Sequence, residues 1–320
     1  TNSINGFLGL QPNADNTSYQ VTGEINLRFQ NALKRGESFA VDWRNLKGET
    51  QQLKSNLNYP YLFNTPFGID GNFELYKRDS TFLEVKSKLA VQYILKNGNT
   101  ISFFYRRNNS SILGQNNGLS STTELANVSS NNYGIGLKKQ KVDYLPNPTK
   151  GYTVDGNFAI GLRTSRENDS SEVLRTNQYS GELDLSYYIP INQRNVLRLG
   201  SITRYLQSPN LFRNELYRFG GLLNQRGFNE DEFFGSGVSI LSLEYRFLVD
   251  KNSRVFLFFD QTYYENQVLS IKDVPYGFGG GFAFGTNIGT FSILYALGRQ
   301  QNNPVLLKNG KIHFGYVAFF

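Results

Sequence analysis

Side chains that could carry out chemistry are scarce in this sequence of 320 residues. It contains no cysteine and one histidine, His313, which excludes disulfides, a thiolate metal site, a thiol nucleophile and a histidine-rich metal cluster. A Ser-His-Asp triad is not credible when the only histidine lies in the last predicted strand. The glycine-rich stretch 277–285 lacks the strand-turn-helix context of a nucleotide-binding loop. We therefore expect no enzyme activity, no metal and no cofactor.

The stretch that stands out is residues 218–235, with Arg226-Gly227-Phe228 at its centre. It carries charged and aromatic side chains together, and it is too long for a hairpin turn. Four glycines within it permit backbone angles that other residues resist: Gly220, Gly221, Gly227 and Gly235. Strand-like segments flank it on both sides. The pattern predicts a large loop that folds back into a barrel formed by these strands.

The segments that must position this loop alternate apolar and polar residues, which is typical of β-strands with two different faces. In the clearest of them, Val85, Leu89 and Val91 lie opposite Glu84 and Lys88. An even number of strands, with short connections alternating with long ones, suits a closed antiparallel outer-membrane barrel. Sixteen strands are predicted, near residues 4–10, 19–29, 39–44, 53–61, 67–77, 83–95, 101–105, 132–139, 152–163, 182–189, 196–206, 241–247, 254–263, 276–285, 291–297 and 311–320.

Strand length and composition indicate that the barrel spans a membrane. No apolar run of about 18 residues is present, so a transmembrane helix is excluded, whereas alternating strands keep the mean hydropathy low in any case. Many predicted strands reach the length of about 9–11 residues that a membrane requires, and soluble strands average about 5–6. The net charge of +7 comes from scattered lysines and arginines. This scatter favours solvated lumen and loop charges and argues against nucleic acid as a partner.

Arg-Gly-Phe, in the one long loop between the eleventh and twelfth of sixteen strands, resembles the BamA/TamA/FhaC-type barrel superfamily of outer-membrane protein assembly and secretion. Members place a [Val/Ile]-Arg-Gly-[Phe/Tyr] motif in this loop, which enters the lumen; here the first position is Gln225. They also carry an acidic residue in strand 12 and a Phe-x-Asp-x-Gly element in strand 13. Glu244 and residues 258–262 match these elements, except that Thr262 replaces the glycine.

The resemblance implies a loop anchor that consists of Arg226, Gly227 and Phe228 together with Glu244 and Asp260. By strand alternation both carboxylates face the lumen, where the guanidinium of Arg226 would arrive. A guanidinium that binds two carboxylates makes a strong, oriented contact. The alternative is that Glu244 and Asp260 are ordinary solvated charges in the lumen.

The last predicted strand ends the sequence at an aromatic residue and has an apolar face, which is similar to the C-terminal signal by which outer-membrane barrels are recognised for insertion. We expect the barrel to close through a weak seam between this strand and the first one, which is short and interrupted by glycine. Glycine weakens strand pairing, and an openable seam exposes backbone edges that can pair with an incoming strand. The alternative is a frayed terminal strand. The predicted seam residues are Ile4, Gly6, Leu8, Phe314, Gly315, Tyr316 and Phe320.

The predicted fold is therefore all-β, a 16-stranded antiparallel transmembrane barrel with an inward-folded loop between strands 11 and 12. The resemblance implies an integral protein of the bacterial outer membrane that assembles, inserts or translocates proteins. Residues 1–320 would form one barrel domain of a longer protein whose upstream periplasmic domains are absent here. Its partners would be membrane lipids, outer-membrane or secreted client polypeptides and accessory assembly subunits. Two alternatives stay open: a secretion conduit, of the two-partner or patatin-type autotransporter kind, and a passive pore.

Overall fold

The computed structural model describes residues 3–12, 19–46, 50–78, 81–113, 124–145, 147–167, 172–286, 289–301 and 305–318, with only the backbone path for residues 3–12, 19–23, 46 and 316–318. Almost all of the described chain is strand. The helical segments in this part are three single turns of 3-10 helix, η1 (Leu62–Asn64), η2 (Arg213–Glu215) and η3 (Leu307–Asn309). None of the described helices is long and apolar enough to cross a membrane.

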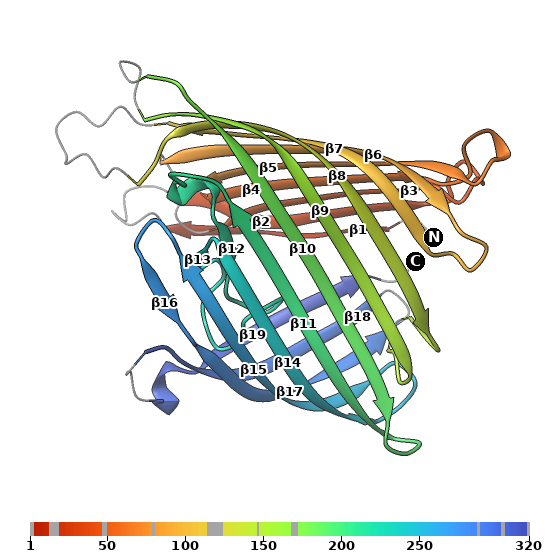
Figure 1. Cartoon of the computed structure of the whole chain (residues 1–320). Coiled ribbons are helices and arrows are strands. Elements are labelled where there is room, and N and C mark those ends of the chain that lie inside the picture. The colour runs from red at the N-terminus through yellow and green to blue at the C-terminus, as the bar shows by residue number, and fades with distance from the viewer. Residues whose placement is uncertain are drawn as a thin grey trace.

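Sixteen strands form one large antiparallel sheet, as the alternation predicts. Each is paired with its neighbour along the chain, and three shorter strands belong to the connections. Figure 1 shows the sheet curling from the red first strands over the green middle strands to the blue last strands. The sixteen are β1 (Ser3–Pro12), β2 (Tyr19–Gln30), β3 (Ser38–Leu46), β4 (Thr50–Tyr59), β5 (Phe67–Arg78), β6 (Phe82–Ile94), β7 (Thr100–Ile112), β8 (Asn127–Val142), β9 (Gly151–Arg166), β10 (Leu174–Pro190), β11 (Asn195–Gln207), β14 (Gly237–Leu248), β15 (Arg254–Asn266), β17 (Tyr276–Thr286), β18 (Gly289–Arg299) and β19 (Lys311–Ala318). The short ones are β12 (Tyr217–Phe219), β13 (Phe233–Gly235) and β16 (Ile271–Asp273).

The two faces of the sheet differ as the alternation predicts. Leu89 on β6 is 61% exposed, whereas its neighbour Lys88 turns to the other face and donates from Nζ to Asn157 Oδ1 at 2.9 Å. On β15, Leu257 is 62% exposed, whereas Asp260 is fully buried. Since successive side chains of a strand point to opposite faces, one face of the curled sheet is apolar and outward. The other carries the polar side chains.

β7 to β10 extend further than their apolar residues suggest. We expected a polar loop over residues 108–130, but β7 continues to Ile112, and Asn108 pairs with Ser130 of β8. Likewise β10 begins at Leu174, although we expected a loop over residues 164–177. A ladder needs only backbone N–H and C=O groups. The alternation therefore ends where apolar contact ends, while the strand pairing continues.

The prediction that the first and last strands pair is not met by the part of the chain that the structure describes. There, β1 pairs only with β2, from Ser3 opposite Arg28 to Pro12 opposite Tyr19, and β19 pairs only with β18. The first strand is also not short, since β1 has 10 residues, while β19 has 8. The weak side-chain pattern of β1 made this strand look shorter than it is, because glycines join a ladder through their backbone like any other residue.

The connections tend to be short on one side of the sheet and longer on the other, with the expected exceptions: those after β3 and β5 comprise only residues 47–49 and 79–81, and that after β8 comprises residues 143–150. After β6, β10 and β14 they comprise residues 95–99, 191–194 and 249–253. After β7, β15 and β18 they comprise residues 113–126, 267–275 and 300–310. The longest, residues 208–236, joins β11 to β14 and contains η2, β12 and β13. We call this segment the long loop.

Candidate functional site

The curled sheet surrounds a cavity of about 1460 Å³, and the long loop contributes to its lining. The lining also comes from the beginning, middle and end of the ladder: β2–β8, β10, β11, β14, β15 and β17–β19. Most of these side chains belong to the polar face, which we call the cavity face, and a few apolar ones, such as Phe314, come from the other face. The long loop crosses this face, and its β12–β13 hairpin pairs Tyr217 with Gly235 and Phe219 with Phe233.

Arg226, at the tip of the long loop, lies between two carboxylates of the cavity face. Its Nε and Nη2 donate to Oδ2 and Oδ1 of Asp260 at 2.7 and 2.6 Å, and its Nη1 donates to Glu244 Oε2 at 2.7 Å. The guanidinium carbon lies 3.6 Å from the centre of the Phe258 ring. All four residues are buried. The three residues that the resemblance assigns to this contact are therefore in direct contact, through a planar fork that lysine could not reproduce.

Glycines allow the tip to approach the sheet backbone closely. Gly227 has φ +95°, and a Cβ at this position would lie 2.7 Å from the backbone of Leu297 on β18. A Cβ on Gly277 of β17 would lie 1.9 Å from the carbonyl oxygen of Arg226, and one on Gly298 would lie 2.6 Å from that of Gly227. Real Cβ atoms do not come this close, so the seat of the tip requires glycine on both the loop and the strands.

The two departures from the superfamily pattern are in contact with each other. Thr262 Oγ1 donates a hydrogen bond to Gln225 Oε1, and both side chains are fully buried. Gln225 Nε2 also faces the carbonyl oxygen of Asp260 at 3.4 Å. A buried polar side chain is costly without a partner. The polar residue on the loop and the one on β15 therefore satisfy each other.

Phe228 packs into an aromatic cluster beneath the β12–β13 hairpin. Its ring meets that of Phe233 edge to face, with centroids 4.9 Å apart, and Phe219 stacks on Phe233 at 5.1 Å. Val238, Ile240 and Tyr264 complete the cluster. Aromatic pairs in such geometries contribute about 0.5–1.5 kcal/mol beyond the area that they bury. The loop is therefore attached by apolar contact as well as by charge.

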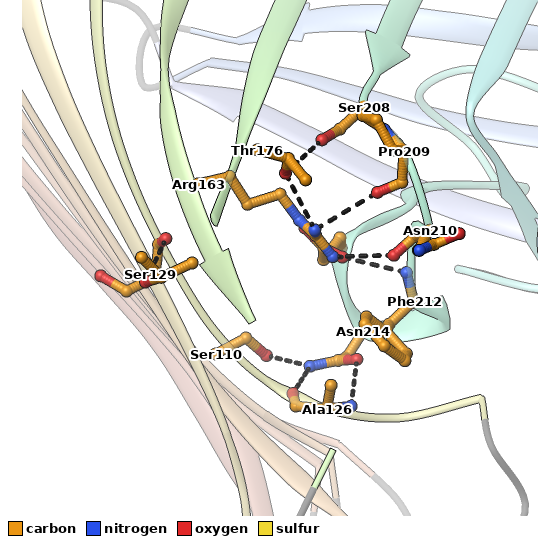
Figure 2. Close-up of polar contacts among 12 residues, drawn as sticks. Ser110, Ala126, Ser129, Arg163, Thr176, Ser208, Pro209, Asn210, Phe212 and Asn214 are labelled. Carbon is orange, nitrogen blue, oxygen red and sulfur yellow. Dashed lines mark hydrogen bonds and ion pairs between the residues drawn. The ribbon is translucent and has the colours of Figure 1, made fainter. Parts of the chain in front are cut away.

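Figure 2 shows a second attachment, at the start of the long loop. Arg163 of β9 donates from Nε and Nη2 to the two carboxylate oxygens of Glu215, each at 2.6 Å, and it is fully buried. Its Nη1 donates to Thr176 Oγ1 and to the carbonyl oxygen of Pro209, and its Nη2 also donates to the carbonyl oxygen of Asn210. Sequence reasoning missed this contact, because it placed Arg163 at the last position of its strand. Alternation through β9 to Arg166 would have put it on the cavity face.

A third attachment joins β12 to β6. Arg218 Nη1 donates to Glu84 Oε2 at 2.8 Å, and its guanidinium carbon lies 3.9 Å from the centre of the Tyr76 ring. Burial opposes the charge of Arg218, but the carboxylates of Glu84 and Asp231 outweigh it and raise the pKa of the guanidinium. The three arginine contacts reach β6, β9, and the β14–β15 pair, so the long loop is attached to distant parts of the sheet.

One carboxylate outside the spanning strands also has a shifted pKa. Asp143 lies in the connection between β8 and β9. Burial acts to raise its pKa, but hydrogen bonds from the hydroxyl and backbone N–H of Thr149 and the backbone N–H of Lys150 together outweigh burial and lower the pKa to about 2. This connection is therefore held in its shape by an ionised aspartate.

The predicted seam residues are not brought together in the described part of the chain. The backbones of Ile4, Gly6 and Leu8 pair with Leu27, Ile25 and Gly23 of β2. Those of Phe314, Gly315 and Tyr316 pair with Ile293, Ser292 and Phe291 of β18. The Phe314 side chain is 73% exposed. Phe320 lies outside the described residues.

The tip of the long loop also touches β19. His313 Nε2 lies 3.5 Å from the backbone N–H of Gly227, from which it can accept a hydrogen bond. A Cβ on Gly315 would lie 2.6 Å from the Leu222 side chain. The loop tip therefore contacts both the anchor on β14 and β15 and the last strand of the ladder.

Known structures resemble this chain over nearly its whole length. The crystal structure of BamA from Haemophilus ducreyi lacking POTRA domains 1-3 matches with a TM-score of 0.65 at 15% identity, over 98% of this chain and 69% of that one. CdiB from Escherichia coli matches with 0.61 at 13% identity, over 99% of this chain and 63% of that one. CdiB from Acinetobacter baumannii matches with 0.58 at 14% identity, over 95% and 56%. No protein-family profile and no curated sequence matches the chain. At this identity the resemblance to the BamA/TamA/FhaC-type barrels is confirmed for the fold.

Proposed function

We propose that this protein is an integral barrel of the bacterial outer membrane that inserts or translocates polypeptides without chemistry of its own. The observation that carries this function is the unpaired outer edge of β1 and of β19 among the described residues, together with a loop tip that contacts β19. The described residues of β1 and β19 each pair on one side only. The similarity of the fold to BamA and CdiB supports the same proposed function.

The exposed apolar face supports a membrane location. Leu89, Val91, Ile135, Phe158 and Leu241 are among the large apolar side chains that lie exposed on it. A large contiguous apolar surface promotes aggregation in water, whereas lipid covers it in a transmembrane barrel. Several strands exceed the length of about 9–11 residues that a tilted strand needs to cross a bilayer. The longer connections would then lie on the extracellular side, and the short ones in the periplasm.

The free edges supply a physical route to insertion. Unpaired backbone N–H and C=O groups on an edge strand template an incoming strand, which adds by β-augmentation. In this proposal β1 and β19 close the barrel through a weak seam and open it for a client strand. The loop tip, fixed by Arg226 and touching β19 at His313 and Gly315, would support the last strand while the seam is open. Client polypeptides and accessory assembly subunits are the partners of this function.

The cavity favours a second candidate, a secretion conduit. Its lining is polar and charged along β2–β8, β10 and β11, which suits an extended polypeptide that passes through the lumen. A conduit requires the long loop to leave its seat, because the loop crosses the cavity face. A passive pore is distinguished from both by its conductance, which should be high and steady while the long loop stays attached.

A disulfide across the seam tests insertion through lateral opening. One cysteine is placed between Asn5 and Leu8 and the other between Phe314 and Val317; the chain has no cysteine of its own, so the product is unambiguous. The bond should form in the folded barrel and should block client insertion by the full-length protein until reductant is added. The matched control links Asn5 to Asn26, its partner on β2, and should leave insertion unchanged.

Two results would count against lateral opening. Failure of the cysteines to join would show that β1 and β19 do not close the barrel. A joined barrel that inserts clients as well as the reduced one would leave the conduit as the better function. Secretion of a client through the joined barrel, with loss of secretion when the long loop is cross-linked to the wall, would establish the conduit directly.

A further inference from the structure

Three arginines gather on the cavity face near the short connections, away from the loop tip. Arg198 lies near the start of β11, Arg246 near the end of β14 and Arg254 at the start of β15. All three line the cavity. Arg246 is buried, and the charges of Arg198 and Arg246 are close neighbours of the Arg254 guanidinium. None of the three arginines belongs to the loop anchor or to the seam, although Arg246 shares Glu244 with the anchor.

Few N–H donors of these three guanidiniums meet a protein acceptor among the described residues. Each guanidinium carries five donors. Within the described chain, Arg198 donates to Ser186 Oγ at 3.0 Å and Arg254 Nη1 to Asn147 Oδ1 at 3.0 Å. Arg246 Nε donates to Glu244 Oε1 at 2.7 Å. Arg254 Nε is sealed from solvent and has no hydrogen-bond partner in the part of the chain that the structure describes. A buried donor without a partner is costly, and it marks a position where an acceptor is missing.

The charges around the cluster do not balance. Glu244 is the one carboxylate that pairs with it in the described residues, and Glu244 also binds Arg226. Asp260 is occupied by the fork of Arg226. Four guanidiniums therefore face two carboxylates, which leaves an excess of two positive charges. Like charges held together in a partly dry site repel each other unless an anion lies between them.

A second segment holds the cluster in place. The connection between β8 and β9 reaches across to the turn between β14 and β15, where Tyr144 OH donates to Asn252 Oδ1 at 2.7 Å and Asn147 Nδ2 to the carbonyl oxygen of Lys251 at 3.3 Å. Asn147 is buried and supplies the acceptor for Arg254. On the other side, the guanidinium carbon of Arg246 lies 5.2 Å from the centre of the Tyr188 ring. Arg198 and Arg254 are thus oriented by neutral partners, which do not offset their charge, while Arg246 is oriented by Tyr188 and by Glu244.

We propose that Arg198, Arg246 and Arg254 form a binding site for a phosphate group. A phosphate carries a charge of about −1.5 to −2 near neutral pH, which matches the excess of positive charge. It also presents several acceptor oxygens, and arginine forks bind such groups in a bidentate way. Inorganic phosphate and the phosphate ester of a lipid headgroup share this chemistry. The proposal does not rest on the transport function, because within the described chain Arg198 and Arg254 make no contact with Arg226 and only Arg246 shares a carboxylate, Glu244, with the loop anchor.

The test uses the folded full chain in a zwitterionic detergent and titrates it with sodium phosphate at constant ionic strength. Saturable binding, measured by calorimetry and by a rise in the thermal midpoint, is expected with phosphate and not with chloride. Arg254→Gln should weaken phosphate binding at least tenfold, and Arg254→Lys, which keeps the charge and loses the fork, should weaken it less. The matched control is Arg175→Gln, which removes the same charge from an exposed arginine of β10.

The outcomes show whether the ligand is a lipid headgroup or free phosphate, and whether the site exists at all. Tighter binding of dihexanoyl phosphatidic acid than of inorganic phosphate identifies a lipid headgroup as the ligand, and the reverse order identifies the free ion. The site is disproved if phosphate gives no saturable binding, or if Arg175→Gln weakens binding as much as Arg254→Gln. Far-ultraviolet circular dichroism confirms that each variant is folded.

Discussion

The contact between Gln225 and Thr262 offers a sharp test of how the long loop is attached. Thr262→Val keeps the shape of the side chain and removes the hydroxyl that donates to Gln225 Oε1. The glutamine then keeps a buried acceptor without its donor, in a site where neither residue is exposed. Leaving one partner of a buried hydrogen bond unsatisfied costs about 1–3 kcal/mol. Gln225→Leu strands the hydroxyl instead and should cost a similar amount.

The double variant distinguishes this contact from general damage. Replacing both partners by apolar groups of similar shape is nearly neutral, so Thr262→Val should be largely compensated by Gln225→Leu. If each single substitution costs about 1–1.5 kcal/mol and the double costs close to none, the two couple by about 2–3 kcal/mol, at the upper end of the range of about 0.5–3 kcal/mol found for residues in contact. Thr153→Val, on the cavity face of β9 and without a side-chain partner among the described residues, is the matched control and should change little.

The assay must report attachment of the loop and not unfolding of the barrel. Limited proteolysis within residues 208–236 does so, because cleavage follows the population of the detached loop when attachment is fast. A cost of about 1–3 kcal/mol corresponds to an increase of about 5- to 150-fold in that population. Each single variant should therefore be cleaved faster by that factor, and the double variant at close to the wild-type rate. Additive effects, or cleavage unchanged in both single variants, would refute the reasoning.

Three further predictions concern the anchor, the membrane face and a connection. Arg226→Ala leaves the Asp260 and Glu244 carboxylates buried without their cation, so loop attachment should weaken by about 3–5 kcal/mol; unchanged protease protection or pore conductance would contradict the anchor. Leu89→Arg should cost about 2–4 kcal/mol in lipid if it lies near the midplane, and Lys88→Leu less, as unfolding titrations in lipid vesicles would show. Since the pKa of Asp143 is lowered to about 2 from 3.8, its contribution to stability is full above the higher value and disappears as the pH falls through the lower one. Asp143→Asn should therefore destabilise the protein at pH 7, and its thermal midpoint should converge with that of the wild type near pH 2.

The strands could be predicted from the sequence because burial alternates with a period of two. Ser242, Glu244 and Arg246 face the cavity, while Leu241, Leu243 and Tyr245 lie on the exposed face. This pattern depends on one strand and its surroundings, so it is visible in the sequence. The ends of β8 and β10 were missed because their polar residues keep the ladder without an apolar neighbour. Pairing of the backbone leaves no trace in side-chain type.

The loop attachments were predictable only in part. The Arg226 contacts were expected because a motif marks the arginine, and alternation places Glu244 and Asp260 on the same face. The Arg163–Glu215 contact joins residues 52 positions apart, and the Arg218–Glu84 contact joins residues 134 apart. Which arginine meets which carboxylate across a curled sheet depends on the three-dimensional path of the loop. Composition and spacing carry no information on that path.

The seat of the loop tip is specified by backbone distance as much as by charge. An arginine fork alone would tolerate a loop displaced by a fraction of an ångström, because long side chains adjust. Gly277 and Gly298 do not adjust, since the carbonyl oxygens of Arg226 and Gly227 occupy the space where their Cβ atoms would lie. The close approach of the loop tip thus explains why β17, which the sequence marks as crowded, carries glycine at position 277. The same seat brings Gly227 to His313 on β19, so a loop that leaves the anchor also leaves the strand beside the seam. Detachment of the loop and release of the last strand should therefore be one event and not two.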